Sequence, residues 1–267
     1  MSIIRTKIDR NKSKSVKVLI TGISGIGKTS QIRSLIDAGK RVLVIDGEAG
    51  LLSVDDLDFS SIHVRDVAVD FGTSAWQICR HLAVLLTGAN PSVAADDIYS
   101  HAHYGMARSM LGDDIFDDFD VVFWDSITEF CRDSLIWSQQ QDEVITKQGA
   151  IDKRAVYGLV GQQMVNFIRQ VQHGKKDIVM IGGLKEKIDE SGESSYSLLL
   201  EGSKSGVELP YIFDEVLTMI ADENEKRFFI TSASNSRGYP AKDRSGNLQA
   251  IEPADLNNVI NKIKDKK

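Results

Sequence analysis

The sequence predicts an α/β fold in which a mainly parallel, twisted sheet carries helices on both faces and gains antiparallel strands at its C-terminal end. Two observations support this prediction. Short β-branched apolar runs alternate with helix-patterned segments as far as about residue 182, and shorter segments of alternating hydrophobicity follow. A strand, a helix and a second strand in succession form a βαβ unit, which requires parallel pairing and a right-handed crossover.

The individual elements follow from this pattern in chain order. In the parallel part we expect strands over 16–21, 41–46, 120–124 and 177–181, helices over 28–38, 74–86 and 152–173, and a mixed segment over 90–119. The last of these helices has apolar residues at i, i+3 and i+4, so it should face the core. Beyond residue 182 we expect antiparallel strands over 196–200, 213–220 and 226–231, and a helix over 253–263 with Pro253 in its first turn.

The composition is that of a folded protein, with 42% hydrophobic and 26% charged residues among 267. No apolar run approaches the roughly 18 residues of a membrane span, and the first residues lack the apolar core of a secretory signal, so we expect a soluble, cytoplasmic protein. Cys79 and Cys131 are too few for a disulfide framework, and we expect buried, reduced thiols. Because one α/β sheet can account for a chain of this length, we expect a single domain over 15–267.

Basic residues gather at the amino end. Residues 1–17 hold six basic residues against one acidic residue, whereas the whole chain carries a net charge of −6. We therefore separate residues 1–14 as a basic tail, which is either a nucleic-acid-facing arm or a solvated terminus. The acidic remainder argues against a protein that coats a duplex with its whole surface.

Residues 22–29 (GISGIGKT) fit the pattern G-x-x-x-x-G-K-[ST] between an expected strand and an expected helix, which is the context of a phosphate-binding P-loop. Its glycines let backbone N–H groups converge on a polyphosphate at a helix N-terminus. Lys28 would contact the β and γ phosphates, and the Thr29 hydroxyl would bind Mg²⁺. We assign the phosphate site to Gly22, Ser24, Gly25, Ile26, Gly27, Lys28, Thr29 and Ser30.

Acidic residues follow two of the expected strands. Asp125 ends the apolar run VVFW and is the expected metal carboxylate, acting on Mg²⁺ through water. Glu48 comes just after the strand over 41–46 and is the candidate for activating the attacking water, because carboxyl ends of parallel strands face the ligand crevice. Asp46 is either structural or a metal ligand. Asp120 begins its strand and should lie at the opposite edge of the sheet.

Together, the P-loop, the segment IDGEAG at 45–50 and the strand end VVFWDS at 121–126 resemble the RecA-like ATPase core. The chain is similar, over roughly residues 15–264, to phage-encoded RecA-like single-strand annealing recombinases. The resemblance implies an Mg²⁺-dependent ATPase that forms rings or filaments of identical chains and binds single-stranded DNA in phage recombination or annealing. It also implies work in the host cytoplasm, with a single-strand-binding protein as a further partner.

The segment KDRSG at 242–246 resembles the Lys-x-Arg-x-Gly element of RadA-type and hexameric-helicase relatives. This resemblance implies that Lys242 and Arg244 reach the nucleotide bound by a neighbouring subunit and neutralise charge on the transferring phosphoryl group. Hydrolysis would then take place at subunit interfaces and depend on assembly.

By the same resemblance, DNA would meet two loops, over about 138–154 and 182–206. Both are long and polar, as binding loops tend to be. Where RecA itself places a Gln that senses the γ phosphate, this chain has GGLK at 182–185, which leaves Lys185 as a candidate substitute. The candidate DNA-binding residues are Lys147, Lys153, Arg154, Lys185, Lys187 and Lys204.

Two alternative functions stay open. One is a small-molecule kinase that uses the same P-loop, although no Arg-rich lid is evident after residue 126. The other is an ATP-gated assembly protein with little catalysis. A GTPase is disfavoured, because no N-K-x-D guanine motif follows the P-loop.

Overall fold

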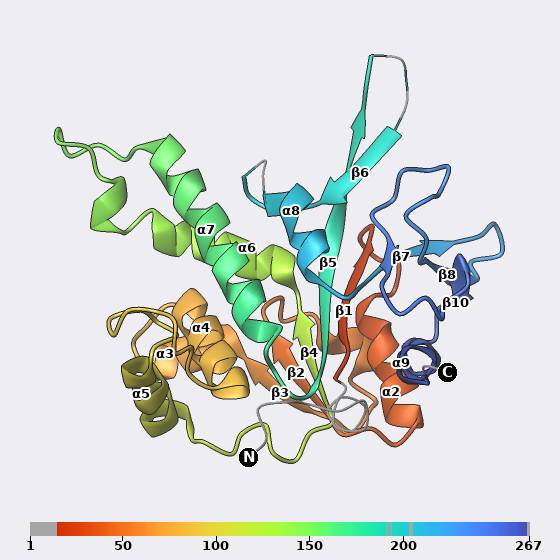
Figure 1. Ribbon diagram of the computed structural model, residues 1–267, viewed down its shortest axis with the longest axis horizontal. Helices are drawn as coiled ribbons and strands as arrows, with labels where there is room; N and C mark the ends of the chain where they lie inside the picture. The colour runs from red at the N-terminus through yellow and green to blue at the C-terminus, as the bar shows by residue number, and fades with distance from the viewer. Residues whose placement is uncertain (1–14, 191, 193, 203–204, 266–267) are drawn as a thin grey trace.

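A mixed sheet organises the protein. The computed structural model describes residues 15–190, 192, 194–202 and 205–265. Within them the strands are ordered β10-β8-β7-β1-β5-β4-β2-β3, with β6 beside β5 and β9 beside β7 (Figure 1). Their bounds are β1 Lys17–Gly22, β2 Val42–Asp46, β3 Ser60–His63, β4 Val121–Asp125, β5 Asp177–Ile188, β6 Ser194–Leu198, β7 Glu215–Ala221, β8 Arg227–Ile230, β9 Lys242–Asp243 and β10 Ile251–Pro253.

The middle of the sheet is parallel, as predicted. β1 pairs with β5 and β7, β4 pairs with β5 and β2, and β2 pairs with β3. β6, β8, β9 and β10 run antiparallel to their partners. The antiparallel prediction for 213–220 is wrong, because β7 lies parallel to β1 with Val18 opposite Glu215. Helix α8 (Ser205–Ile212), which packs beside α7, returns the chain so that β7 can run in this direction.

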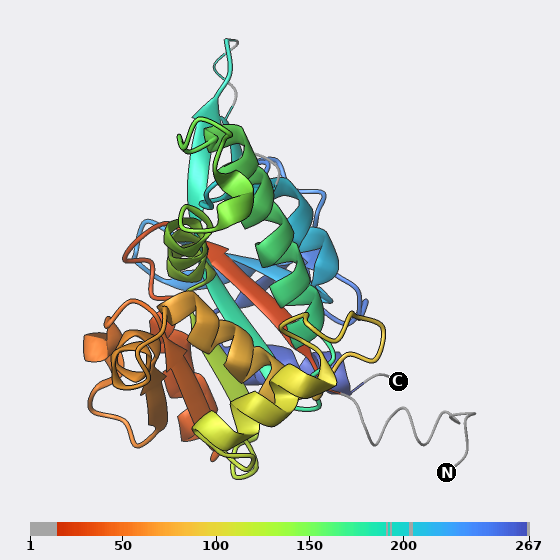
Figure 2. The ribbon, with the colours of Figure 1, turned by 90° about the vertical axis from the view of Figure 1, so that its left-hand side faces the viewer.

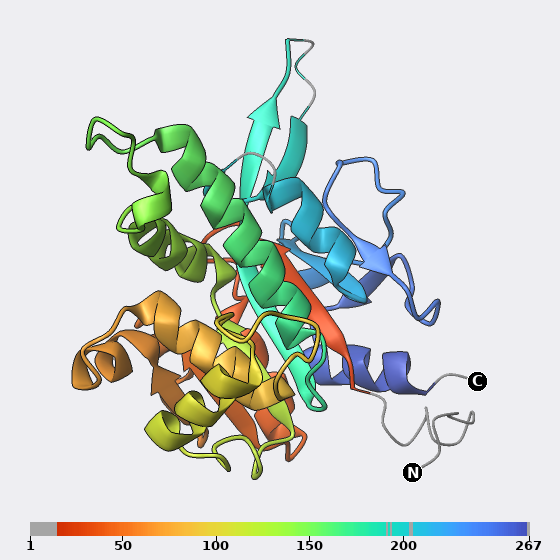
Figure 3. The same cartoon turned by 60° about the vertical axis from the view of Figure 1, so that its left-hand side comes forward.

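Helices cover both faces of the sheet, which confirms the predicted fold class. The group α3 to α8 lies on one face, where α7 crosses in front of β1 and β5, and α2 and α9 cover the other face (Figure 3). The bounds are α2 Ile32–Asp37, α3 Val64–Asp70, α4 Ala75–Thr87, α5 His101–Leu111, α6 Ile127–Ser138, α7 Lys153–Val171 and α9 Leu256–Lys264, with 3-10 turns η1 Thr29–Gln31, η2 Leu51–Val54 and η3 Asp142–Val144.

The strand sequences explain the two layers of core. Leu19, Trp124 and Met180 are buried against the α4, α6 and α7 face, whereas Val18 and Phe123 are buried against α2 and α9. Successive side chains of a strand point to opposite faces of the sheet. A strand in a sheet that is covered on both faces therefore needs apolar residues at successive positions, as these strands have.

Some local expectations differ from the structure. The helix expected over 28–38 begins as the 3-10 turn η1, and the α-helix starts only at Ile32. The mixed segment over 90–119 contains α5, which begins after Ser100. Pro253 lies in β10, and α9 begins after Asp255, whose side chain accepts a hydrogen bond from the Asn258 N–H group.

Strand β5 is longer than predicted. It continues past residue 181 to Ile188 and forms an antiparallel hairpin with β6, in which Glu186 lies opposite Tyr196. The hairpin projects beyond the rest of the sheet in two perpendicular views (Figures 1 and 2). At its base, the Gly183 N–H group donates to Thr128 Oγ1 at 2.9 Å, which ties β5 to α6.

The buried cysteines follow the prediction, since Cys79 and Cys131 are free thiols in the core. Across the described part of the chain, every helix is too short or too polar to span a membrane.

Candidate functional site

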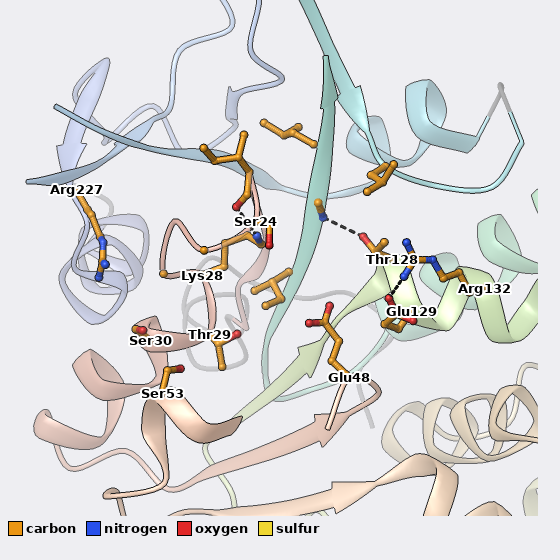
Figure 4. A pocket seen from close by; sticks show the side chains of 17 residues that line it. Ser24, Lys28, Thr29, Ser30, Glu48, Ser53, Thr128, Glu129, Arg132 and Arg227 are labelled. Atoms are coloured by element: carbon orange, nitrogen blue, oxygen red, sulfur yellow. Dashed lines mark hydrogen bonds and ion pairs between the residues drawn. The ribbon is translucent and has the colours of Figure 1, made fainter. Parts of the chain in front are cut away.

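A cavity of about 660 Å³ opens where the parallel strands end (Figure 4). The P-loop follows β1, Glu48 follows β2, Thr128 follows β4, and Gly183 belongs to β5. Because these strands are parallel, their carboxyl ends meet at one edge of the sheet. The fold therefore collects residues that are far apart in the sequence around one cavity.

The P-loop owes its shape to glycines and to Lys28. Gly25 and Gly27 have φ angles of 74° and 98°, a region that residues with side chains rarely adopt. A Cβ atom at Gly22 would stand 2.8 Å from Ile26 Cγ2, so the loop closes tightly on itself. The Lys28 Nζ donates to the Gly22 carbonyl oxygen at 3.1 Å, which holds the lysine across the loop.

The predicted phosphate-site residues divide into two groups. Ile26 packs partly buried against the core beside α2 and, with Gly22, does not line the cavity. These two residues therefore shape the loop from behind. The residues that line the cavity are Ser24, Gly25, Gly27, Lys28, Thr29 and Ser30.

Thr29 and Asp125 meet inside the site. The Thr29 Oγ1 donates to Asp125 Oδ2 at 2.7 Å, although 96 positions separate the two residues. Asp125 Oδ1 is buried and has no hydrogen-bond partner among the described residues. A free carboxylate oxygen beside a hydroxyl is a set of hard oxygen donors that suits Mg²⁺. The two residues therefore fit the predicted metal, which would neutralise charge on the β and γ phosphates.

The electrostatics of the site also suit an anion and a cation bound together. Burial, with Glu48 and Asp46 nearby, raises the pKa of Asp125 to about 7. Burial lowers the pKa of Lys28, against the opposing pull of Glu48 and Asp125. In both cases burial removes water from the charged side chain, and the neighbouring opposite charges do not fully compensate for this loss. A phosphate beside Lys28 and a cation beside Asp125 would supply those charges.

Glu48 points into the cavity from the turn after β2 (Figure 4). Its Oε1 accepts a hydrogen bond from Ser126 Oγ. Ser126 directly follows Asp125, and the peptide bond between these two residues is cis. Asp46 holds the turn, because its Oδ1 accepts the N–H groups of Glu48 and Ala49 at 3.0 and 2.9 Å. Asp46 therefore has at least the structural role of the two predicted for it, because it shapes the turn that presents Glu48 to the cavity.

The comparison with known families agrees with this arrangement. A family model described as an AAA domain matches residues 14–245, which is most of the chain. The chain belongs to the AAA domain family. This is a family of P-loop NTPases, and the matched region contains the P-loop, Glu48 and Asp125. No curated protein matches the chain.

The basic pair predicted to act on a neighbouring subunit lies away from the cavity of its own AAA domain. Lys242 belongs to β9, which pairs with the first residues of β7, whereas the P-loop follows the far end of the parallel strand β1. Its Nζ donates to the carbonyl oxygens of Tyr211 and Phe213 at 3.0 and 2.6 Å. Arg244 pairs with Asp214 at 2.7 Å and is 62% exposed. Action on a neighbouring nucleotide stays a prediction.

The loop placement predicted for most DNA candidates is wrong. Lys185 and Lys187 lie in β5, because pairing with β6 extends that strand. Lys153 and Arg154 form the first turn of α7, as the helix predicted over 152–173 requires, because the Asp152 side chain accepts the backbone N–H of Arg154 and caps the helix there.

Of the remaining DNA-binding candidates, one lies in a loop as predicted and one falls outside the described residues. Lys147 is in the loop between η3 and α7. Lys204 and the basic tail over 1–14 fall outside the described residues. Lys185 does not line the cavity, whereas Gly183 and Leu184 do, so the proposed replacement of the γ-phosphate-sensing Gln by Lys185 has no geometric support.

Several residues that line the cavity were missed by sequence reasoning. Thr128, Glu129 and Arg132 occupy α6, where Arg132 forms an ion pair with Glu129. Polar residues at i, i+1 and i+4 just after the strand ending at Asp125 are a signal that could have found them. Arg227 begins β8 and reaches the cavity from the other side, and neither its spacing nor its neighbours in the sequence indicate this.

Proposed function

We propose that this AAA domain is an Mg²⁺-dependent ATPase that assembles with copies of itself and acts on single-stranded DNA in phage recombination or strand annealing. One observation carries the ATPase part of the proposal. Lys28, the Thr29–Asp125 pair and Glu48 converge on one cavity from three separate strand ends.

In the proposed hydrolysis, each group of residues at the site has a separate role. The P-loop N–H groups and Lys28 would bind the phosphates and orient them. Thr29 and Asp125 would hold Mg²⁺ at the outer phosphates. Glu48, kept in place by Ser126, would accept the proton of a water molecule aimed at the γ phosphate.

The position of the β5–β6 hairpin supports a link between the nucleotide and DNA. Gly183 and Leu184 line the cavity, and the same strand continues into the projecting hairpin. Lys185 and Lys187 share one face of that strand, since they are two positions apart. On the other face, Glu186 accepts hydrogen bonds from Ser194 and Tyr196 on β6. The hairpin therefore offers a basic face to a phosphate backbone.

A second basic group projects from the same end of the molecule (Figure 1). Lys147 precedes α7, and Lys153 and Arg154 begin it. Two basic elements at one end would track a flexible strand better than a rigid duplex, because a single strand can follow their spacing.

Assembly is proposed from Lys242 and Arg244, which lie at the opposite end of the parallel strands from the P-loop. Arg244 follows β9, is 62% exposed and does not line the cavity of its own chain, so its side chain is open to contact with a neighbouring chain. If the pair acts in a neighbouring site, hydrolysis requires contact between chains, as for other finger residues supplied in trans.

The test is the ATPase rate, measured with and without single-stranded DNA across protein concentration. We expect turnover per chain to rise with protein concentration and with DNA. Turnover that depends on neither would favour the kinase alternative, and nucleotide binding without turnover would favour the ATP-gated assembly protein. A double variant, Lys185→Gln with Lys187→Gln, should weaken DNA binding and lower its salt dependence, whereas Lys175→Gln, an exposed residue just before the start of β5, should change neither.

A further inference from the structure

Arg227 lies against the P-loop and lines the cavity, but it has no role in the hydrolysis steps proposed above. A Cβ atom built on Gly27 would stand 2.8 Å from Arg227 Nη1 and 2.9 Å from Cζ. The guanidinium group therefore packs directly on the Cα atom of Gly27. Gly27 has a φ of 98°, a backbone conformation that residues with side chains rarely adopt, and the guanidinium group occupies the space beside its Cα atom.

The main chain of Arg227 is anchored on both sides. It pairs with Ala221 of β7, and its carbonyl oxygen accepts the Ala254 N–H at 3.2 Å. The side chain is exposed and lines the cavity. A residue held in this way presents its charged end from a rigid strand, which limits the conformational entropy lost when it binds a ligand.

The Arg227 guanidinium has no partner of its own within the described part of the chain. The other arginine that lines the cavity, Arg132, is ion-paired with Glu129. Arg227 has neither an ion pair nor a side-chain hydrogen bond to any described residue, although a guanidinium carries five N–H donors. Its charge is thus available to an anion held by the P-loop.

The side of the P-loop on which Arg227 lies indicates which part of the nucleotide it meets. Figure 4 shows Arg227 on one side of Lys28, with Glu48, Thr128 and Arg132 on the other. Glu48 must lie near the γ phosphate if it activates water. The opposite side of the loop is then where the α phosphate leads to the nucleoside.

We propose that Arg227 binds the α-phosphate end of the nucleotide within its own chain and sets the affinity for ATP and ADP alike. This inference rests on the proposed nucleotide-binding function. It gives Arg227 and Arg244 different tasks, because Arg227 would hold the nucleotide in cis and Arg244 would promote hydrolysis in trans. ADP retains the α phosphate, so a contact there stabilises substrate and product equally and leaves the turnover rate at saturation unchanged.

The experiment compares Arg227→Gln with the unaltered chain by titration with Mg-ADP, and with Mg-ATP in a Glu48→Gln background that slows turnover. Loss of one charge-assisted contact should raise both dissociation constants about 10- to 100-fold. The kcat of Arg227→Gln at saturating ATP should stay within about twofold of the unaltered value. The dissociation constants of Arg227→Lys should lie between those of the unaltered chain and of Arg227→Gln, because an ammonium group keeps the charge but not the planar guanidinium with its paired donors.

Two controls separate binding from folding and cis from trans. Arg169→Gln alters an exposed arginine on α7 outside the cavity and should leave both dissociation constants unchanged. The unfolding midpoint of Arg227→Gln without nucleotide should match that of the unaltered chain, since the side chain is exposed. Mixing Arg227→Gln chains with Lys28→Ala chains should not restore affinity, because both residues serve the same chain's site.

Several results would overturn the inference. Unchanged dissociation constants would make Arg227 a bystander, and a fall in kcat with unchanged affinity would make it a residue of the hydrolysis step. Restored affinity in the mixture would show that it acts in trans. If the unaltered chain binds neither nucleotide, the proposed function and this inference are both refuted. If the unaltered chain binds both nucleotides and Arg227→Gln binds them equally well, only the inference is refuted.

Discussion

Replacing Glu48 with Gln is the sharpest test of the hydrolytic site. Gln has the same shape and keeps an Oε1 atom that can accept the hydrogen bond from Ser126 Oγ. The side chain should therefore keep its direction and lose only its ability to accept a proton. A positioned general base contributes typically 10²- to 10⁴-fold to a rate, so kcat should fall by that factor, equivalent to about 3 to 5 kcal/mol in the barrier.

Nucleotide affinity should not fall in the same variant. Glu48 is an acid beside a cavity for an anion, and removing its charge relieves repulsion of the phosphates. The Glu48 charge also contributes to the raised pKa of Asp125, so its loss favours the ionised form that binds Mg²⁺. Titration with Mg-ATP should give a dissociation constant equal to or below that of the unaltered chain, while phosphate release from ATP gives kcat.

Two matched variants define the outcome. Glu129→Gln removes another acid that lines the same cavity but is already paired with Arg132, and its kcat should stay within a few-fold of normal. Ser126→Ala removes only the hydrogen bond that orients Glu48, worth about 1.5 kcal/mol for a charged acceptor, and should slow turnover about tenfold. Retention of more than a tenth of normal kcat by Glu48→Gln would refute the assignment of Glu48 as the base.

Four further outcomes are expected. Lys28→Ala should abolish ATP binding or turnover, because it removes the cation that faces the β and γ phosphates; an unchanged ATPase rate would eliminate this site. Arg244→Ala should bind nucleotide normally but hydrolyse it slowly, and mixing it with Glu48→Gln chains should partly restore activity, whereas no recovery would favour a purely structural loop. Phe167→Ala should lower the free energy of unfolding by about 3 to 5 kcal/mol in denaturant titrations, because the ring packs between two buried tryptophans at 5.2 and 5.3 Å. Burial lowers the pKa of His81 to about 4 from an ordinary value near 6.5, so the folded chain resists a proton that the unfolded chain accepts, and stability falls as pH drops from 6.5 to 4. At pH 5 this loss is about 2 kcal/mol, and His81→Gln should lose that much less stability than the unaltered chain between pH 7 and pH 5; equal losses would contradict the assignment.

Part of the site could be read from local sequence because its geometry is local. Gly25, Gly27 and Lys28 take their conformations from residues only a few positions away, so a short motif specifies them. Asp125 and Glu48 were found by a rule that is nearly as local, since both follow apolar runs that had to be buried strands. The parallel direction of those strands then placed both acids at the edge that carries the P-loop.

The direction of β7 and the length of β5 were beyond such rules. Residues 213–220 have the same alternating pattern whichever way the strand runs, and only the packing of α8 beside α7 makes β7 parallel to β1. β5 continues past residue 181 because β6 is available to pair with it, which no property of 182–188 alone indicates. The loops predicted to carry Lys185 and Lys187 became a hairpin for this reason.

The amino-acid sequence by itself determined the α/β class, the P-loop and the acids at two strand ends, because each depends on contacts within a short stretch or on the two-residue period of a buried strand. Only the tertiary structure decided which distant residues share the cavity. Thr29 reaches Asp125, and Arg227 reaches Gly27, through a sheet order that places β1 between β5 and β7. Strand order results from the packing of the whole chain, so contacts that depend on it are not encoded in any single segment.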